Sequence, residues 1–286
     1  MSRKKNHVRK KADTPDPASP RWGRRIFLRF LATVGAVYAL ILGYHLAVPR
    51  QSVDAREGFL ENCRELCLSY GIIPTGHIAN DARAYLDAAL PEKLSSSLAE
   101  ILADDQFVIA ASQPHPLLGQ TAPDFKLPND RGEFVDLHTL TSKGPVIVVF
   151  YYGYGCSHCV AQLFGLQKDL KHLRELGAEV VAISSDSPAH TAEKFEEYGR
   201  FDFPVLSDQD QKVAREFGTY IPSTEDRSED LKHGTFLLDR TGTVQFAQLG
   251  YQPFLDNKSL LFWLAEKRPE LPVTRVGQQA ITGEVK

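Results

Sequence analysis

The chain has 286 residues, of which 43% are hydrophobic, so it is long enough to bury the core of one large domain or of two small ones. Acidic and basic residues nearly balance, with a formal net charge of -3, which gives no indication of a nucleic-acid partner. Four cysteines are too few for a disulfide-built scaffold. Their grouping into two pairs, Cys63 with Cys67 and Cys156 with Cys159, is more informative than their number.

Two segments precede the expected folded part. Residues 1–25 are rich in Lys, Arg and Pro, which predicts a disordered basic tail. Residues 26–48 are mostly apolar and about as long as a bilayer-spanning helix, with Arg29 placed near the start, where its side chain can snorkel. These features predict a transmembrane signal anchor that is not cleaved. The alternative is an amphipathic or buried helix of a soluble domain.

The charge on either side of this segment predicts its orientation. The basic residues gather before it, so the positive-inside rule keeps the tail in the cytoplasm and places the remainder of the chain outside. The sequence Gly-Arg-Arg-Ile-Phe-Leu-Arg at 23–29 also resembles a twin-arginine export signal. We therefore expect a single-pass protein of the bacterial inner (cytoplasmic) membrane whose main domain faces the periplasm.

A small helical segment is expected over residues 49–113. Apolar residues recur at helical spacing over 54–70, and further helices are expected from Asn80 to Leu90 and from Pro91 to Ala103.

Cys63 and Cys67 lie on the first of these helices, four residues apart and on one face. They can be two small buried apolar side chains, a local disulfide that acts as a second redox pair, or part of a metal site completed by His77 or His115. An exported location favours the second interpretation, but the sequence alone leaves all three open.

The main domain is expected over 117–270, with a loose tail over 271–286. It begins with two short strands joined by a turn at 129–132. Strands and helices then alternate, and a hairpin and a helix close the domain, which predicts an α/β sandwich with a central mixed sheet. Strands are predicted at 122–127, 133–137, 146–150, 179–184, 203–206, 235–238 and 244–249, and helices ending at 176, 198, 217 and 266.

The sequence Cys156-Ser-His-Cys159 lies where the strand at 146–150 gives way to a helix. A helix N-terminus presents unpaired N–H groups and positive partial charge, both of which favour a reactive thiolate. His158 can add positive charge when it is protonated. The pattern predicts a dithiol/disulfide redox centre, and its main rival is half of a structural zinc site, which would need a second ligand pair.

Five segments of the main domain resemble the alkyl hydroperoxide reductase/thiol-specific antioxidant (AhpC/TSA) family, over about residues 117–268. The resemblance implies the thioredoxin fold with an added N-terminal hairpin, and cysteine redox chemistry with no bound cofactor. The segments are Gly119-Gln-Thr-Ala-Pro-Asp-Phe125, Pro145-Val-Ile-Val-Val-Phe-Tyr151, Phe203-Pro-Val-Leu-Ser-Asp208, Val213-Ala-Arg-Glu-Phe-Gly218 and Gly234-Thr-Phe-Leu-Leu-Asp239.

The active-site pattern departs from the peroxiredoxin pattern Pro-x-x-x-Thr-x-x-Cys of this family. Cys159 falls at the peroxidatic cysteine, while Cys156 replaces the threonine and Tyr152 the proline. His233 stands where the family has an arginine. The family's threonine and arginine donate hydrogen bonds that polarise the O–O bond, so their replacement argues against fast peroxide reduction.

These residues support two enzymatic hypotheses. The leading one is a thiol–disulfide oxidoreductase that acts on protein thiols or disulfides with an electron-donor protein as partner. Cys156 is then the nucleophile and Cys159 the resolving cysteine, while His158 and His233 tune pKa and proton transfer. His158, between the cysteines, predicts a stabilised thiolate and so a relatively oxidising pair. The alternative is an antioxidant thiol peroxidase in which Cys159 is peroxidatic and Cys156 resolving.

A third hypothesis belongs to another class of function. Cys156, Cys159 and His233 resemble the two-cysteine, one-histidine copper site of Sco-type assembly factors, although those proteins space their cysteines differently. Soft thiolate ligands suit Cu(I). His233 can also be simply a polar residue beside its strand.

Overall fold

The computed structural model describes residues 21–47, 55–90, 93–224 and 229–266. They fall into two units divided near residue 52, which are treated separately here. The predicted tail over 271–286, and the predicted basic tail up to residue 20, lie outside the described residues.

The first unit contains helix α1 (Arg21–Ala47), which covers the segment expected to be a signal anchor. The side chains at 26–39 are exposed, among them Phe27, Phe30 and Tyr38. The membrane-spanning helix is not confirmed: in the described part of the chain no helix is both long enough and apolar enough to cross a membrane.

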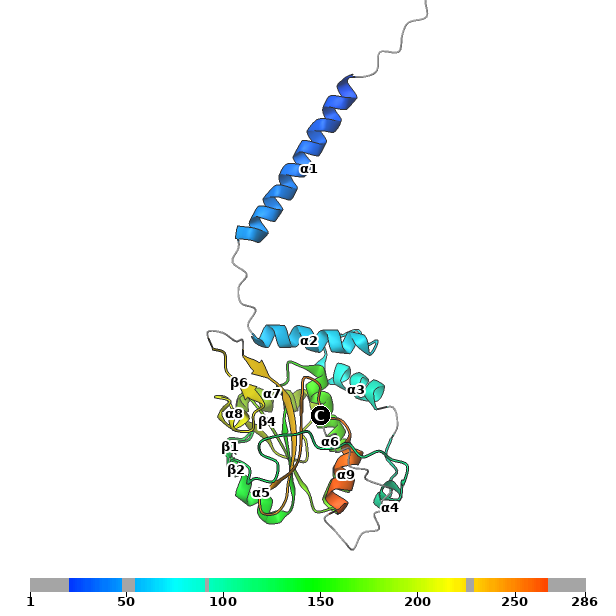
Figure 1. The fold of residues 1–286 in the computed structure, drawn as a ribbon, viewed down its shortest axis with the longest axis vertical. Coiled ribbons are helices and arrows are strands. Elements are labelled where there is room, and N and C mark those ends of the chain that lie inside the picture. Colours follow the sequence, from blue (N-terminus) through cyan, green and yellow to red (C-terminus); the bar gives the residue numbers. More distant parts are fainter. Residues whose placement is uncertain (1–20, 48–54, 91–92, 225–228, 267–286) are drawn as a thin grey trace, which may run out of the picture. The chain divides into compact units, whose positions relative to one another are not determined.

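A five-stranded mixed sheet forms the centre of the second unit, in the order β5-β4-β3-β8-β9. The strands β3, β4 and β5 are parallel, whereas β8 runs antiparallel to both β3 and β9. This confirms the predicted thioredoxin-like α/β fold with a central mixed sheet (Figure 1). The strands are β3 (Val146–Phe150), β4 (Glu179–Ser184), β5 (Val205–Ser207), β8 (His233–Leu238) and β9 (Val244–Gly250).

Strand β3 reads as a continuous apolar run because both faces of the sheet are covered. Alternate residues point to opposite faces, so Ile147 and Val149 join one core cluster while Val146 and Val148 join the other. The first core lies under helices α6 (Ser157–Glu175) and α9 (Asn257–Glu266). The second lies under α5 (Leu137–Lys143) and α8 (Lys212–Glu216).

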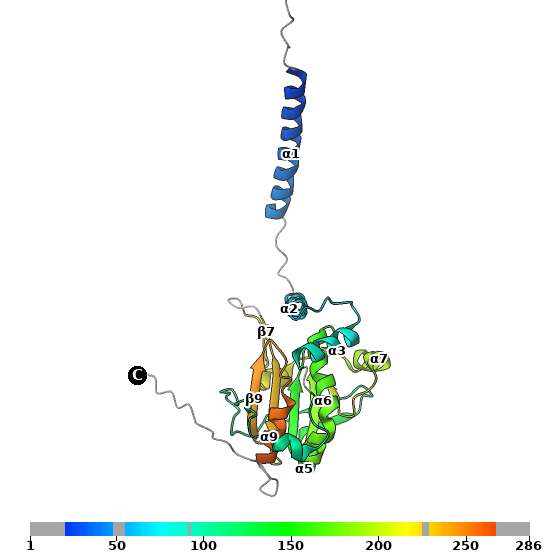
Figure 2. The same ribbon diagram turned by 90° about the vertical axis from the view of Figure 1, so that its right-hand side faces the viewer.

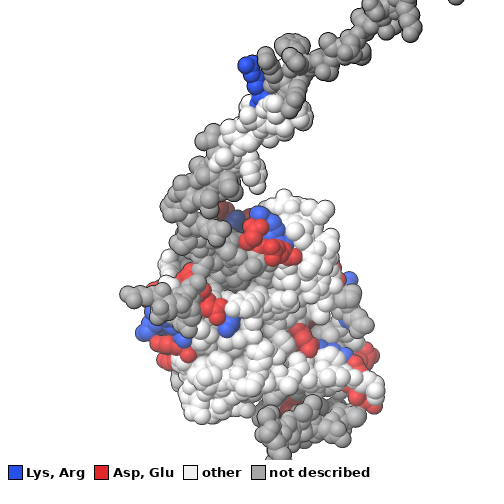
Figure 3. Space-filling view, turned by 45° about the horizontal axis from the view of Figure 1, so that its top comes forward, with Lys and Arg blue, Asp and Glu red and all other residues white. Residues whose placement is uncertain are grey.

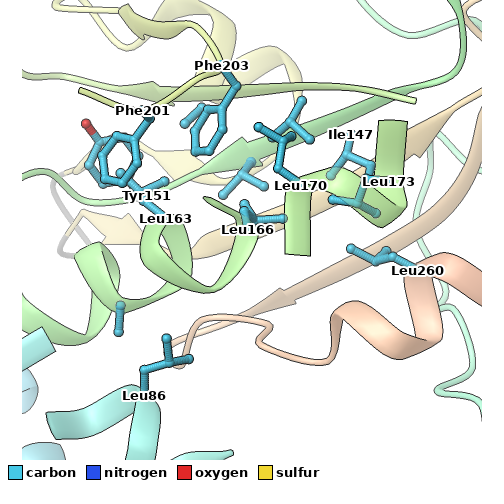
Figure 4. Close-up of a cluster of buried hydrophobic side chains, with 14 of the residues drawn as sticks. Leu86, Ile147, Tyr151, Leu163, Leu166, Leu170, Leu173, Phe201, Phe203 and Leu260 are labelled. Atoms are coloured by element: carbon cyan, nitrogen blue, oxygen red, sulfur yellow. The ribbon is translucent and has the colours of Figure 1, made fainter. Parts of the chain in front are cut away.

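Helix α6 provides the largest apolar contribution to the first core. Its labelled leucines point toward the sheet in Figure 4, whereas Leu86 of α3 lies on the opposite side of the helix, next to Gly165. The labelled side chains of α6 in that view are Leu163, Leu166, Leu170 and Leu173. Burying leucines such as these contributes roughly 1.5–3 kcal/mol each to the stability of the fold. Their packing holds α6, and with it the cysteines at its N-terminus, in place against the sheet.

The predicted helical segment before the domain is present, with one shorter helix. It comprises α2 (Ala55–Ser69), α3 (Ile78–Ala89) and α4 (Leu98–Leu102). The third helix was expected to begin at Pro91, but it begins after Ser97, whose side chain caps it by accepting from the Glu100 N–H. Figures 1 and 2 show α2 across the end of the domain, beside α3 and the start of α6.

Some short elements were not predicted. The expected N-terminal hairpin is present as β1 (Lys126–Pro128) and β2 (Phe134–Asp136), but α5 follows it directly, with Asp136 as its N-cap. The strands β6 (Tyr220–Ile221) and β7 (Asp230–Leu231) pair with each other and are too short to show a pattern. Helix α7 (Pro188–Tyr198) lies where it was expected, opened by Ser187 and Pro188.

Charged side chains are mixed in sign on the face that Figure 3 shows. They gather in small groups of both signs, separated by wide uncharged areas. This view therefore shows no basic surface of the kind that binds nucleic acid.

Candidate active site

The cysteine pair lies at the N-terminus of α6, the helix that follows β3 in the chain. Cys156 is the N-cap of α6, and its sulfur accepts a hydrogen bond from the Cys159 N–H at 3.4 Å. The side chain therefore faces the unpaired N–H groups of the helix, as the sequence predicted. Cys156 and Cys159 form a disulfide, with their Cα atoms 5.4 Å apart.

The disulfide is closed off from solvent. Cys156 is 1% exposed and Cys159 is 0% exposed. A reactant must therefore be small, or the elements over the site must move before it can reach either sulfur.

His233 reaches the site through the pairing of β3 with β8. In this antiparallel register Phe150 pairs with Gly234, so His233 stands beside the loop that leads from β3 to the cysteines. Its Nε2 lies 3.0 Å from the sulfur of Cys159. The structure thus brings together two residues that are 74 positions apart, and an imidazole stands beside the sulfur that the family pattern identifies as peroxidatic.

His158 contacts the other cysteine of the pair, Cys156. Its Nδ1 and Nε2 are 3.4 and 3.5 Å from the sulfur of Cys156, and its ring centroid is 5.4 Å from that of His233. Tyr85 of α3 packs against the His158 ring at 5.7 Å. Both predicted histidines therefore contact the cysteine pair.

The two imidazoles are neutral at pH 7 in this disulfide state. Burial lowers the pKa of His158 from 6.5 to about 4. Burial and the neighbouring His158 lower the pKa of His233 to about 3. The positive charge that a protonated His158 could add is therefore absent from the disulfide form, because the low-polarity surroundings disfavour the charged ring. That the pair is relatively oxidising stays a prediction. Neutral imidazoles can still donate and accept protons.

Cys63 and Cys67 of α2 lie directly over this site. The sulfur of Cys63 is 2.9 Å from that of Cys156 and 3.7 Å from Nε2 of His158. The sulfur of Cys67 is 3.2 Å from Oγ of Ser157. All these side chains are buried, and burial raises the pKa of the Cys63 thiol.

The possible metal ligands group differently from the predicted sets. Among the described residues, one group brings its ligand atoms within 4.8 Å of one another, formed by Cys63, Cys156, His158 and Cys159. This group contains Cys63 and His158 in addition to the cysteine pair, whereas the copper hypothesis had combined the pair with His233.

The histidines proposed to complete a site at Cys63 and Cys67 belong elsewhere. His77 is 3.9 Å from Glu197, and the ring of His115 packs on Phe236. That version of the metal hypothesis is wrong, because α2 folds onto the N-terminus of α6 instead of toward either histidine.

The sequence analysis missed the support under the loop before Cys156. The Tyr154 N–H donates to Oδ2 of Asp186 at 2.8 Å, and Gly153 sits above the same carboxylate with φ at 127°. A Cβ at Gly153 would approach Oδ2 of Asp186 to 2.7 Å. The position of Asp186 just past the carboxyl end of a parallel strand was the available signal, since functional groups gather at that edge.

The AhpC/TSA family profile matches residues 118–247. Peroxiredoxin Bcp of Escherichia coli is 31% identical over 150 residues, which are 52% of this chain and 95% of that protein. Chloroplastic peroxiredoxin Q of Gentiana triflora is 34% identical over 129 residues, which are 44% of this chain and 56% of that protein.

Among solved structures, peroxidoxin BcpB from Mycobacterium tuberculosis is 31% identical, with a TM-score of 0.48. The match covers 54% of this chain and 99% of that one. The profile match and the near-complete coverage of the Escherichia coli relative confirm the expected family. The chain belongs to the AhpC/TSA family.

Proposed function

We propose that this protein, a thiol-dependent oxidoreductase by its family, reduces hydroperoxides with Cys159 as the attacking cysteine and Cys156 as the resolving one. The observation that carries the proposal is the 3.0 Å contact between Nε2 of His233 and the sulfur of Cys159. It supplies a hydrogen-bonding group beside the sulfur that aligns with the family's reactive cysteine, in place of the missing arginine.

The proposed reaction has two steps. The Cys159 thiolate attacks one peroxide oxygen, the O–O bond breaks, and the leaving oxygen takes a proton to depart as an alcohol or water. The Cys156 thiol then attacks the sulfenic acid and releases water, which yields the Cys156–Cys159 disulfide seen in the structure. An external dithiol must afterwards reduce this disulfide.

The local geometry supports both steps. The N-terminus of α6 stabilises negative charge on sulfur, and the neutral His233 can donate a hydrogen bond to a thiolate or to the departing oxygen. The Cys156–Cys159 disulfide is the bond that the second step would form.

The burial of the pair favours a small substrate. Both sulfurs are covered, and α2 lies over them. A peroxide needs room for two oxygens, whereas a protein disulfide would have to displace α2. The relatives named as peroxiredoxins support the same choice.

Stopped-flow kinetics on the full chain would test this proposal. The protein is reduced under metal-free conditions and mixed with one equivalent of hydrogen peroxide. We expect Cys156→Ser to consume peroxide in the first turnover and Cys159→Ser to react at least about 100-fold more slowly. Equal rates in Cys159→Ser and wild type would contradict the proposal.

A thiol–disulfide oxidoreductase remains the second candidate, because Cys156 is the N-cap of α6 and is touched by another thiol. Cys156 would then attack a substrate disulfide, and Cys159 would resolve the mixed disulfide. Rapid exchange of the reduced protein with a small aromatic disulfide, together with slow loss of thiols to peroxide, would favour this function.

We further propose an extracytoplasmic location for the domain, supported by the basic residues before the apolar segment at 26–48 and by the export-like sequence at 23–29. Fusing a reporter enzyme that folds only in the periplasm to the C-terminus would test it. An active fusion is expected, and an inactive but stable fusion would contradict it.

A further inference from the structure

The cysteines of α2 stand in a position that the proposed reaction does not use. Cys63 and Cys156 are 93 residues apart in sequence, yet their sulfurs are 2.9 Å apart, closer than two non-bonded sulfurs normally pack. Ser157 contacts Cys67 at 3.2 Å, so both cysteines of α2 face the two residues that begin the active-site motif.

Thiol–disulfide exchange requires a thiolate that attacks one sulfur of a disulfide and a leaving sulfur that can carry negative charge. Cys63 contacts Cys156, so its attack there would release Cys159. Cys159 is next to His233 at 3.0 Å and lies in the first turn of α6. These surroundings stabilise a departing thiolate, which makes Cys156 the better sulfur to attack.

His158 lies beside the two sulfurs that would exchange. Its Nε2 is 3.7 Å from the sulfur of Cys63, and its Nδ1 is 3.4 Å from the sulfur of Cys156. An imidazole in this position can hydrogen-bond to either sulfur while the proton of Cys63 moves to the released thiolate.

Cys67 can complete the transfer. Residues four apart on a helix have Cα atoms about 6 Å apart, which is within the range that disulfides span. A Cys63–Cys67 disulfide can therefore form with modest adjustment of α2. It would lie on a helix whose other face is open, as the 51% exposure of Leu68 shows.

We propose that Cys63 and Cys67 are an internal dithiol that reduces the Cys156–Cys159 disulfide and carries the oxidation to α2. The Cys63 thiol loses its proton and forms a bond to the sulfur of Cys156, while the Cys156–Cys159 bond breaks and Cys159 leaves as a thiolate. Cys67 then attacks Cys63, releasing Cys156. The released thiolates of Cys159 and Cys156 take the protons lost by Cys63 and Cys67. The Cys156–Cys159 disulfide is thus reduced to two thiols, and the Cys63 and Cys67 thiols are oxidised to a disulfide.

This inference rests on the proposed function, in which peroxide supplies the oxidising equivalents. It adds one exchange step after the Cys156–Cys159 disulfide has formed. The external reductant would then be a dithiol protein that meets α2 instead of the buried pair. The sequence alone left a second redox pair at Cys63 and Cys67 as one of three interpretations. The contact between Cys63 and Cys156 is the path by which that pair would exchange with the Cys156–Cys159 disulfide.

Disulfide mapping on the full chain tests the relay independently of peroxide chemistry. The reduced, metal-free protein receives one equivalent of diamide, which oxidises dithiols directly, and free thiols are blocked in acid before mass spectrometry. In Cys67→Ser we expect the mixed Cys63–Cys156 disulfide to rise at least about tenfold over wild type. In wild type we expect Cys63–Cys67 beside Cys156–Cys159.

Two further variants sharpen the result. Cys67→Ala repeats the first test in case serine disturbs the packing, and Leu68→Ser is the matched control, because it changes an exposed position of the same helix and should leave the wild-type disulfides. A Cys67→Ser or Cys67→Ala protein that holds only Cys156–Cys159 would overturn the relay. Such a result would leave the proposed peroxidase function standing. Conversely, slow consumption of peroxide would overturn the peroxidase function and leave the relay standing.

Discussion

The sulfur of Cys63 on α2 lies 2.9 Å from the sulfur of Cys156 at the N-terminus of α6. The contact joins the small helical segment to the AhpC/TSA domain at the point where redox chemistry is expected. It makes α2 both the cover of the active site and a possible participant in its reaction.

His233 should assist peroxide cleavage through its contact with Cys159. Replacing it with Ala removes a hydrogen-bonding group aimed at the reacting atoms, which typically costs about 100-fold or more in rate. We expect a loss of that size in first-turnover peroxide consumption and partial recovery in His233→Gln, which retains a donor. His115→Ala is the control, since it removes a ring that packs on Phe236. A wild-type rate in His233→Ala would show that the imidazole plays no part.

Stability should fall as the solution is acidified below about pH 6.5. His158 and His233 have folded-state pKa values of about 4 and 3, while the unfolded chain protonates them near 6.5, so the unfolded state binds more protons in this window. Stability from their neutral state is therefore complete above pH 6.5 and is lost at up to about 1.4 kcal/mol per pH unit for each histidine as pH falls.

Urea unfolding of the disulfide form between pH 7 and pH 5 measures this slope. His233→Asn should flatten it, whereas His77→Asn, which removes a half-exposed ring, should not. Equal slopes in wild type and His233→Asn would mean that the buried ring titrates alike in both states.

Gly153 should be intolerant of a side chain. Its φ of 127° is strained for other residues, and a Cβ would stand 2.7 Å from Oδ2 of Asp186. We expect Gly153→Ala to destabilise the protein by more than about 1 kcal/mol and to slow disulfide formation by displacing the loop before Cys156. Gly132→Ala is the control, since Gly132 also has a positive φ, of 77°, but a Cβ there meets nothing within 4 Å, so a larger loss at Gly153 reports its clash and its more strained φ. Identical losses would argue against a role for the Asp186 contact.

Leu166 should be among the most costly core positions to truncate. It is 1% exposed and lies in the cluster of α6 side chains against the sheet (Figure 4). Leu166→Ala should lower the free energy of unfolding by about 2–5 kcal/mol, whereas Leu68→Ala, at a 51% exposed position, should change it by less than about 0.5 kcal/mol. A small effect at Leu166 would mean that α6 is anchored less firmly than its burial indicates.

Local patterns predicted the core of the fold and the first cysteine pair. The continuous apolar run of β3 and the helical spacing after Cys159 were sufficient to place the pair at a helix N-terminus. The family resemblance brought His233 to the same place, and the β3–β8 pairing confirms it.

Long-range packing could not be predicted in the same way. No local pattern tells that α2 folds back onto α6, because the periodicity of a helix shows that it has an apolar face but not what that face covers. The neutrality of His158 was missed for the same reason, since its burial depends on Tyr85 and Cys63 from other helices.

The central claim is that Cys159 is the sulfur that peroxide oxidises. In the full chain carrying Cys63→Ser and Cys156→Ser, the two thiols whose sulfurs lie within 4.8 Å of Cys159 are removed. A sulfenic acid formed on Cys159 should then persist long enough to be trapped with dimedone. After one equivalent of hydrogen peroxide, mass spectrometry should find the adduct on Cys159. An adduct on Cys67 alone, or none with the peroxide unconsumed, would contradict the account.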